Sequence, residues 1–365
     1  MTVGRVLIVG NFLSGHGNSR GVCEELAPRL RESGWSVLTT SARRGRTARF
    51  ADMLATVWLR RHDYDVAQVD VYSGPAFLWA EGVCHLLRRA GKPYVLTLHG
   101  GGLPAFSAAR SQRVRRLLHS AVAVTVPSTY LLTQMKPYRE DLVLMPNGIS
   151  LSAYHFTIRR PQPRLVWLRA FHQIYNPGMA VKVLRRLKDE HPSLSLTMTG
   201  GDKGDSSLEA VVSDAERLGV RSLLTVQGPV KKEDVPAVLD AGDIFLNTSL
   251  VDNTPVSVLE AMASGLNVVS TEVGGLPFLL TNEEDALLVP SGDDAAMAGA
   301  IRRLLADPEL AQRMQTAARA KVEEFEWDVV LPKWCSLLAS AAHGRHVTAT
   351  SILRHSPAEV AERAE

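Results

Sequence analysis

Residues 252–277 read Asp-Asn-Thr-Pro-Val-Ser-Val-Leu-Glu-Ala-Met-Ala-Ser-Gly-Leu-Asn-Val-Val-Ser-Thr-Glu-Val-Gly-Gly-Leu-Pro. An acidic loop with Pro255 leads into a short helical pattern that carries one carboxylate, Glu260. A glycine turn, a buried strand and the pair Gly274-Gly275 follow. This order predicts a ligand site on an α/β scaffold, because loops between strands and helices commonly carry binding residues.

The start of this helix has the features of an anion site. Pro255 suits the first helical position, where its missing N–H costs nothing. The amides near Val256 and Ser257 are then expected to point out of the helix N-terminus, which attracts anions and hydroxyl-rich groups. Glu260 follows about one turn later, where its carboxylate can accept two hydrogen bonds from a vicinal diol such as a ribose.

The first half of the chain alternates apolar runs with helical patterns. The run Arg5-Val-Leu-Ile-Val-Gly10 has the form of a central parallel strand that is covered on both faces. Repeated alternation predicts a doubly wound parallel sheet. We expect strands at 5–10, 35–40, 66–71, 94–98 and 122–126, and helices at 21–33, 77–90 and 110–119.

The alternation restarts after the polar stretch 159–163, which is the best linker candidate. Two successive doubly wound units are therefore predicted. Ligands of such sheets bind at the carboxyl ends of the strands, so we expect the two rims to face each other across a cleft. The second unit should have strands at 165–168, 194–199, 223–227, 244–247 and 267–270, and helices at 179–190, 209–218, 235–241 and 258–263.

The composition is that of an ordinary globular protein. The 365 residues are 45% hydrophobic and 22% charged, which suits two to three domain-sized units. No run of about 18 apolar residues occurs, and the N-terminus leads directly into a strand, so a cytoplasmic protein is expected. The three cysteines are odd in number and widely spaced, which predicts free thiols and neither a disulfide framework nor a metal site.

The charge is distributed unevenly along the chain. Residues 1–150 carry 19 Lys and Arg against 10 Asp and Glu, whereas the whole chain has a net charge of +3. These arginines can simply lie on solvated helix faces, since arginine is a good helix former. The functional alternative is contact with an anionic membrane surface or lipid phosphate, peripheral at the inner face of the membrane. The basic half has neither aromatic residues interleaved with its arginines nor a recognisable nucleic-acid-binding module, so a nucleic-acid partner is not predicted.

The stretch at 252–277 resembles the donor-site signature of family 4 of the retaining, nucleotide-sugar-dependent glycosyltransferases. That signature has two glutamates eight positions apart, followed by Ala-Met-Ala-x-Gly. Here the first of the two is Asp252, one methylene shorter, and the second is Glu260. The resemblance is strongest over 194–340 and weaker over 1–150.

The resemblance implies the GT-B architecture, with two Rossmann-like domains. It places an acceptor-side domain at 1–158 and a nucleotide-sugar-binding domain at 159–325. A helix at 326–341 is expected to cross back and pack on the first domain, and 342–365 would form a tail.

Further positions match the family pattern. The strand-end histidine that members place near the reacting sugar corresponds to His99, and the glycine loop that covers the donor corresponds to Gly15 and Gly17. The glycine pair after a strand is Gly200-Gly201, and the turn over the nucleotide base is Pro229 and Val230. The remaining donor-binding residues implied by the match are Asn253, Thr254, Pro255, Val256 and Ser257.

The chain departs from the family in its phosphate clamp. Members present an arginine and, several residues on, a Lys-Gly pair that together neutralise the diphosphate. Arg169 supplies the arginine, but the Lys-Gly pair falls on Asn176-Pro177. Lys203 or His172 is the candidate replacement, since an uncompensated leaving group would slow bond cleavage.

The resemblance implies a retaining transferase with His99, Arg169, Asp252 and Glu260 at its centre. A UDP-sugar is the expected co-substrate, and the acceptor would be a glycan, a lipid-linked glycan or a small molecule. No metal or cofactor is implied, because the arginine and a helix terminus can carry the charge. His99 would orient the sugar, and the departing phosphate oxygen would take the acceptor proton. Asp252 also has a purely structural alternative as a helix N-cap.

Several functions remain open at this stage. Cell-surface polysaccharide or glycolipid assembly is the leading hypothesis for the pathway, and a tailoring enzyme for a secondary metabolite is its rival. A sugar-nucleotide epimerase or hydrolase of the same fold, or a non-catalytic sugar-binding protein, would also account for the donor signature.

Overall fold

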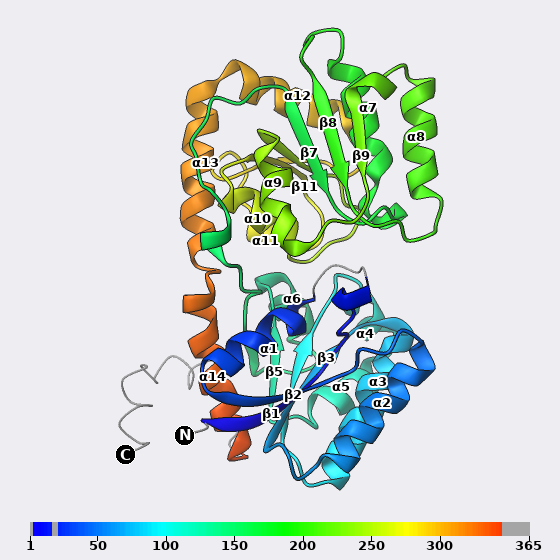
Figure 1. Ribbon diagram of the computed structural model, residues 1–365, viewed down its shortest axis with the longest axis vertical. Coiled ribbons are helices and arrows are strands. Elements are labelled where there is room, and N and C mark those ends of the chain that lie inside the picture. Colours follow the sequence, from blue (N-terminus) through cyan, green and yellow to red (C-terminus); the bar gives the residue numbers. More distant parts are fainter. Residues whose placement is uncertain (1–2, 17–20, 345–365) are drawn as a thin grey trace. The chain divides into compact units, whose positions relative to one another are not determined.

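The computed structural model describes residues 3–16 and 21–344, and these form two compact units (Figure 1). Unit 1 contains the described residues up to 148 and those from 327 onward, and unit 2 consists of 149–326. Within the described ranges, no helix has both the length and the apolar character needed to cross a bilayer.

Unit 1 is built on one parallel sheet of six strands in the order β2-β1-β3-β4-β5-β6. Its inner strands β3, β4 and β5 are almost wholly buried and rich in Val and Leu, as expected for a sheet covered by helices on both faces. The chain reverses its winding direction at β1, which pairs with β2 on one side and β3 on the other. The strands are β1 (Gly4–Val9), β2 (Trp35–Thr40), β3 (Val66–Val71), β4 (Tyr94–Leu98), β5 (Ala123–Val126) and β6 (Leu142–Leu144).

Helices cover both faces of this sheet. One face carries α2 (Arg46–Leu59), α3 (Phe77–Arg89), α4 (Leu103–Ala109), α5 (Ser111–Leu118) and α6 (Thr129–Met135). The other face carries α1 (Val22–Glu32) and α14 (Trp327–Ala342). Trp327, Val330 and Trp334 of α14 lie in one core with strand residues Val6 and Ile8. The last helix therefore returns to the first unit after the chain has formed the second.

Unit 2 repeats the design with a sheet in the order β12-β11-β10-β7-β8-β9. Here the winding reverses at β7, which lies between β10 and β8. The prediction of two doubly wound parallel sheets is confirmed. The strands are β7 (Arg164–Leu168), β8 (Ser195–Thr199), β9 (Leu224–Gln227), β10 (Ile244–Asn247), β11 (Asn267–Thr271) and β12 (Leu287–Val289).

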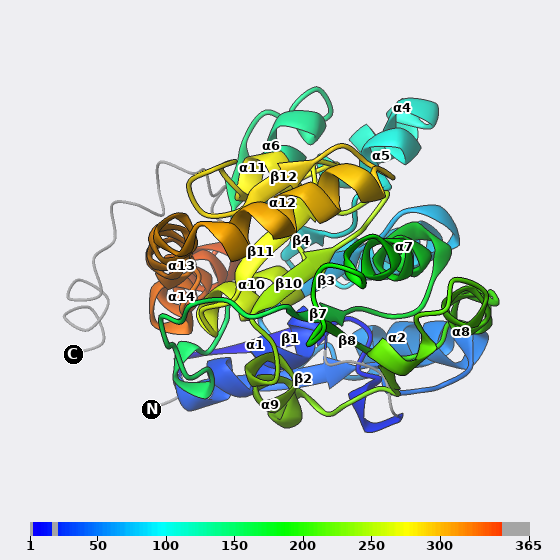
Figure 2. The same cartoon turned by 90° about the horizontal axis from the view of Figure 1, so that it is seen from above.

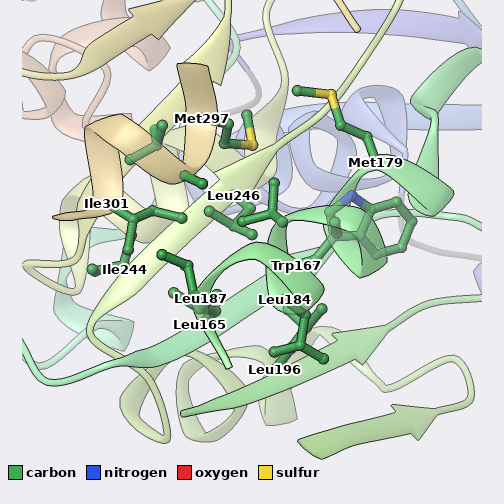
Figure 3. Packing of buried hydrophobic residues seen from close by; sticks show 14 of the residues in the cluster. Leu165, Trp167, Met179, Leu184, Leu187, Leu196, Ile244, Leu246, Met297 and Ile301 are labelled. Atoms are coloured by element: carbon green, nitrogen blue, oxygen red, sulfur yellow. The ribbon is translucent and has the colours of Figure 1, made fainter. Parts of the chain in front are cut away.

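The helices of unit 2 enclose two separate apolar cores. The core in Figure 3 joins β7, β8 and β10 to α7 (Pro177–Leu187), α8 (Ser207–Arg217) and α12 (Asp294–Ala306). Figure 2 shows α12 lying along β11 and β12. The opposite core contains α9 (Val235–Asp240), α10 (Val256–Ala263) and α11 (Leu276–Leu279), and α13 (Pro308–Glu323) contributes to both.

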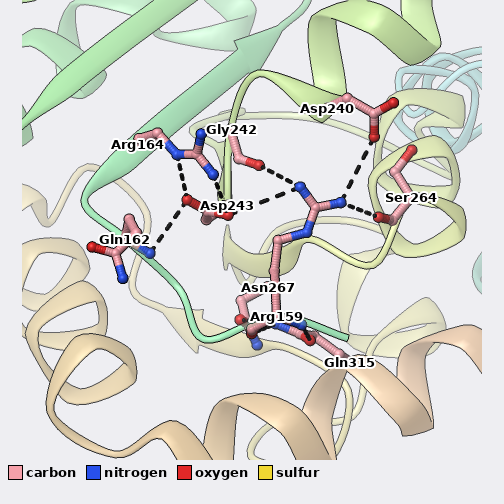
Figure 4. A network of polar contacts seen from close by, with 9 residues as sticks. All are labelled: Arg159, Gln162, Arg164, Asp240, Gly242, Asp243, Ser264, Asn267 and Gln315. Atoms are coloured by element: carbon pink, nitrogen blue, oxygen red, sulfur yellow. Dashed lines mark hydrogen bonds and ion pairs between the residues drawn. The ribbon is translucent and has the colours of Figure 1, made fainter. Parts of the chain in front are cut away.

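The stretch expected to be a linker is instead fixed to unit 2 (Figure 4). The backbone of Arg159 exchanges two hydrogen bonds with Gln315, and its guanidinium donates to the Ser264 carbonyl at 3.1 Å. Asp243, which is fully buried, accepts from Arg164 at 2.6 Å and 3.0 Å. Residues 159–163 thus form part of the second unit, and the division between the units falls at 148–149 and 326–327.

Candidate functional site

The candidate site of unit 2 is built at the reversal point of its sheet. Arg169 directly follows β7, and the loop 248–255 directly follows β10. Because β7 and β10 are parallel neighbours, their carboxyl ends lie at the same edge of the sheet, and ligands of doubly wound sheets bind near such a reversal point. This topology places Arg169 next to the acidic loop.

Arg169 and Asp252 form an ion pair at this point. The other contacts of Asp252 are a hydrogen bond to Oδ2 from the Ser249 hydroxyl at 3.1 Å and one to Oδ1 from the Asn253 amide at 2.9 Å. The guanidinium of Arg169 also lies over the ring of Tyr175, 4.4 Å from its centroid. Asp252 is therefore not the helix N-cap; it holds the arginine in one orientation.

The electrostatics of this pair keep the arginine charged. Burial lowers the pKa of the Arg169 guanidinium, but the nearby Asp252, Tyr175 and Glu260 together outweigh burial, so this pKa lies above its ordinary value. The Nε atom of Arg169 is buried and has no hydrogen-bond partner among the described residues. The arginine thus retains a donor for a further ligand.

Two hydrogen bonds join the two loops that carry the pair, and a third joins the loop after β10 to β7. The amide of Leu250 donates to the Ile174 carbonyl at 2.7 Å, and the hydroxyl of Thr248 donates to the Tyr175 carbonyl at 2.7 Å. Trp167 on β7 donates its ring N–H to the same hydroxyl at 2.9 Å. These bonds fix the loop after β10 to the loop after β7, which makes the Arg169–Asp252 arrangement rigid.

The glycines of the motif are explained by close backbone contacts. A Cβ atom at Gly274, where φ is +55°, would lie 2.0 Å from the Asp252 carbonyl oxygen, and one at Gly275 would lie 2.1 Å from that of Asn253. A Cβ at Gly200 would lie 1.8 Å from the Arg169 carbonyl oxygen. The absence of a side chain at Gly200 therefore makes room for the backbone of Arg169.

Helix α10 begins one residue later than the sequence suggested. Pro255 is the N-cap, with φ −69° and ψ 120°, and Val256 is the first helical residue. No acceptor within the described residues binds the amides of Val256 and Ser257, and the buried Thr254 hydroxyl has no partner there either. Asn253, Thr254 and Pro255 are buried and line up directly before these free donors.

Glu260 has two partners that no local motif indicates. It is 4% exposed, and its Oε1 atom lies 2.5 Å from Nζ of Lys232 and accepts from the Tyr154 hydroxyl at 2.9 Å. Lys232 follows the predicted base-contacting turn, in which Pro229 is exposed and Val230 is half-buried. The distance along the chain from Glu260 to both partners explains why no local motif indicated them.

The departure in the phosphate clamp has a clear local structure. Asn176 adopts a left-handed conformation, φ 46°, and Pro177 occupies the first position of α7. Asparagine tolerates such a backbone, and proline suits that helical position. The described part of the chain gives Lys203 no ion pair and leaves it exposed, whereas His172 is 3.8 Å from Asp205 and accepts from the Ile174 amide through Nδ1. Among the described residues, neither side chain forms an ion pair or hydrogen bond with Arg169 or Asp252.

The remaining predicted residues lie in unit 1. His99 follows β4 and is buried, with Nε2 2.9 Å from Oδ1 of Asp70 and its ring stacked on Tyr72 at 4.9 Å. Gly15 lies exposed in a single 3-10 turn at Ser14–His16, and Gly17 lies outside the described residues. Asp70 is a further contact that the sequence did not reveal.

Within the described ranges no group of three or more His, Cys, Asp and Glu side chains could hold a metal ion. All three cysteines are free, and Cys23 and Cys84 are buried, as expected.

Comparison with known families covers most of the chain. Residues 157–321 match the family model described as glycosyl transferases group 1, and residues 16–153 match the model described as glycosyltransferase family 4. The chain belongs to the family 4 glycosyltransferases. The recognition made from residues 252–277 is confirmed, and the two models meet close to the division between the units.

Curated relatives match part of this family 4 chain. An amylovoran biosynthesis glycosyltransferase of Erwinia amylovora is 31% identical over 172 residues, which are 45% of this chain and 42% of the relative. A glycogen synthase of Mycobacterium tuberculosis is 26% identical over 57% of this chain and 50% of its own. A D-inositol 3-phosphate glycosyltransferase of Streptomyces avermitilis is 29% identical over 51% and 42%. The chain thus spans about half the length of these relatives.

Solved structures establish the GT-B fold over nearly the whole chain. Anabaena HepE in complex with UDP and glucose superimposes with a TM-score of 0.74 at 16% identity and covers 92% of this chain and 100% of that one. A sucrose-phosphate synthase of Thermosynechococcus elongatus gives a TM-score of 0.76 at 19% identity, with 92% and 98% covered.

Proposed function

We propose that this family 4 protein transfers a sugar from a nucleotide-diphosphate sugar, most simply a UDP-sugar, to an acceptor hydroxyl with retention of the anomeric configuration. The observation that supports this most directly is the site of unit 2. There Arg169, held by Asp252, keeps a free buried donor, and the unbonded amides of Val256 and Ser257 begin the helix that carries Glu260.

Each part of the donor has a matching group in this proposal. The diphosphate would contact Arg169 and the N-terminus of α10, which together favour negative charge. The ribose would contact Glu260, the base would contact Pro229 and Val230, and the sugar hydroxyls would lie near Asp252. Among solved structures of this fold, HepE was crystallised with UDP-glucose, which supports a UDP-sugar as donor.

The proposed chemistry uses charge stabilisation of the leaving group. As the glycosidic bond breaks, negative charge grows on the diphosphate, and preorganised donors such as Arg169 and the α10 amides lower that barrier. The departing phosphate oxygen would take the acceptor proton, and the acceptor would attack from the same side, which gives retention. A guanidinium and a helix N-terminus can supply the charge compensation, so the proposal includes no metal ion.

We further propose that the acceptor belongs to a cell-surface polysaccharide or glycolipid. The E. amylovora relative supports this by its name, which describes amylovoran biosynthesis. Peripheral contact of unit 1 with an anionic membrane is part of the same proposal. Its support is the end of α2, where Trp58 and Leu59 are 41% and 72% exposed directly before Arg60 and Arg61.

The test is release of nucleoside diphosphate from a panel of nucleotide sugars, with a metal chelator present. Slow hydrolysis of one donor that Glu260→Ala abolishes would support the transferase. An epimerase would return a new sugar nucleotide, and a sugar-binding protein would return neither product. Absence of turnover with every donor and acceptor would overturn the proposal.

A further inference from the structure

Asp70 and His99 lie in a polar cluster inside unit 1, at the carboxyl edge of its sheet. Asp70 is on β3 with 3% of its side chain exposed, and His99 directly follows the neighbouring β4 with 9% exposed. Oδ1 of Asp70 lies 2.9 Å from Nε2 of His99. β3 is also the strand beside β1, where the sheet reverses its winding, and ligands of doubly wound sheets bind near that point.

The other hydrogen bonds of Asp70 indicate whether Asp70 or His99 carries the hydrogen that lies between them. Gln68 donates its Nε2–H groups to Oδ1 of Asp70 at 2.8 Å and to the Thr97 hydroxyl at 2.7 Å. Oδ1 of Asp70 is therefore an acceptor, and the hydrogen between it and His99 belongs to the imidazole. The neutral ring is then the Nε2–H tautomer, with an unshared electron pair on Nδ1.

The orientation of the His99 ring is set by its neighbours, as its tautomer is. Tyr72 stacks on the imidazole with an interplanar angle of 19° and 4.9 Å between centroids. A Cβ atom at Gly10, at the end of β1, would lie 2.7 Å from Oδ2 of Asp70, so this glycine leaves room for the carboxylate. Among the described residues Nδ1 of His99 has no hydrogen-bond partner. His99 thus presents an oriented acceptor at Nδ1, and the buried Oδ2 of Asp70 and Oε1 of Gln68 also lack hydrogen-bond partners among the described residues.

We infer that Asp70 is the positioning residue of the sugar-transfer site. It holds His99 as the Nε2–H tautomer so that Nδ1 accepts a hydrogen bond from a hydroxyl of the bound substrate. The inference rests on the proposed function for its substrate, whereas the tautomer itself is a property of the unliganded protein. Asp70 acts through His99 and is not itself a catalytic residue.

A purely structural role for Asp70 makes different predictions. A carboxylate that only stabilised the sheet would leave the tautomer of His99 free to vary, and its replacement would lower stability without a selective effect on turnover. A positioning carboxylate changes the tautomer and the turnover together. When such a carboxylate becomes an amide, the amide N–H can face Nε2 and force the proton onto Nδ1.

The first measurement is the ¹⁵N NMR spectrum of protein labelled at histidine, at about pH 8, above the usual histidine pKa. The signal of His99 is identified among the 11 histidines by its loss in His99→Gln. We expect Nε2–H in the wild type and a shift toward Nδ1–H in Asp70→Asn. An Nδ1–H tautomer in the wild type overturns the inference, even if Asp70→Asn fails to fold.

The second measurement compares turnover and nucleotide affinity. Asp70→Asn should lower kcat/KM by about a hundredfold or more and leave the Kd for UDP unchanged, since the proposed nucleotide contacts are in unit 2. Asp63→Asn, a surface carboxylate of unit 1 paired with Arg60, is the matched control and should match the wild type. Wild-type kcat/KM in folded Asp70→Asn would contradict the inference. Absence of UDP binding by the wild type would instead count against the proposed function and leave the tautomer test standing.

Discussion

Nζ of Lys232 lies 2.5 Å from Oε1 of Glu260, and the Tyr154 hydroxyl donates to the same oxygen at 2.9 Å. A carboxylate oxygen has two lone pairs, so these two donors occupy Oε1 fully. Oε2 remains for a ribose hydroxyl, and Oε1 can accept from a second hydroxyl only if Lys232 moves away. The arrangement adds a cation to a site whose usual clamp lysine is replaced by Asn176-Pro177.

We expect the Lys232 ammonium to turn from Glu260 to the bound diphosphate, so replacing Lys232 by methionine should weaken UDP binding by about tenfold, since one charge-assisted hydrogen bond contributes roughly 1.5 kcal/mol or more. Lys231→Met is the matched control, since that side chain is exposed and has no ion pair with Glu260. Isothermal titration with UDP measures both. Tighter binding by Lys232→Met would mean that the lysine only competes with the ribose for Glu260.

Replacing Arg169 by glutamine should lower the free energy of unfolding by about 2 kcal/mol, since Asp252 then stays buried without its cation. The double variant Arg169→Gln/Asp252→Asn should recover part of this loss, because neither charge remains. Urea unfolding of Arg169→Gln, Asp252→Asn and the double variant gives the coupling energy. Strict additivity of the two single effects would contradict a direct interaction.

Arg169→Lys should also impair turnover. Lysine keeps the charge but lacks the planar fork that reaches Asp252 and the flat surface that lies over Tyr175. The measurement is kcat/KM for the active donor, and wild-type activity in this variant would show that charge alone suffices.

Gly274→Ala should disrupt the donor site, because its Cβ would lie 2.0 Å from the Asp252 carbonyl oxygen. Gly292→Ala is a matched control with φ +77° and no atom within 4 Å of the new Cβ. The free energy of unfolding of the control should fall by only about 1 kcal/mol, because alanine disfavours this backbone conformation. Its UDP affinity should equal that of the wild type. Equal affinity in both variants would mean that the loop tolerates displacement.

Stability should fall at alkaline pH through a buried thiol. Burial raises the pKa of Cys84 to about 12, whereas a cysteine in an unfolded chain ionises near 8.5. Below about pH 8.5 the thiol is neutral in both states and adds no pH dependence. Between about 8.5 and 12 only the unfolded state loses the proton, so the free energy of unfolding decreases as pH rises.

Cys84→Ala should reduce this alkaline slope by up to about 1.4 kcal/mol per pH unit. Denaturant unfolding between about pH 7 and 10 compares the two proteins. Buried Cys23, whose pKa burial also raises, should retain part of the slope in the variant. An unchanged slope would contradict selective ionisation of Cys84 in the unfolded state.

The sequence predicted the parts of the fold and the site that depend on local pattern. The apolar runs gave strands that differ from β1, β4 and β10 by at most one residue at an end, and the glycines after β8 and β11 lie next to the donor loops. Arg169 and Asp252 were both placed, but their ion pair was not, because it depends on the neighbouring positions of β7 and β10. The sequence patterns predict no helix at α2, α12 or α13.

The contacts that could not be predicted join residues far apart in sequence. Glu260 and Tyr154 are separated by 106 positions, and His99 and Asp70 by 29. A register between β3 and β4 shifted by one residue would turn Asp70 and His99 to opposite faces. Only the tertiary structure fixes that register. The specific roles of His99, Lys203 and the donor-binding residues stay predictions.

The most direct test of the central claim is a titration of the protein with UDP in the presence of a metal chelator, for the wild type and for Glu260→Gln. The account predicts saturable binding to the wild type and a loss of at least about tenfold in affinity in the variant, because a neutral amide cannot match the carboxylate as an acceptor for the ribose hydroxyls. Equal affinity in the two proteins would contradict the placement of the nucleotide at α10, and no binding to either would contradict the donor site itself.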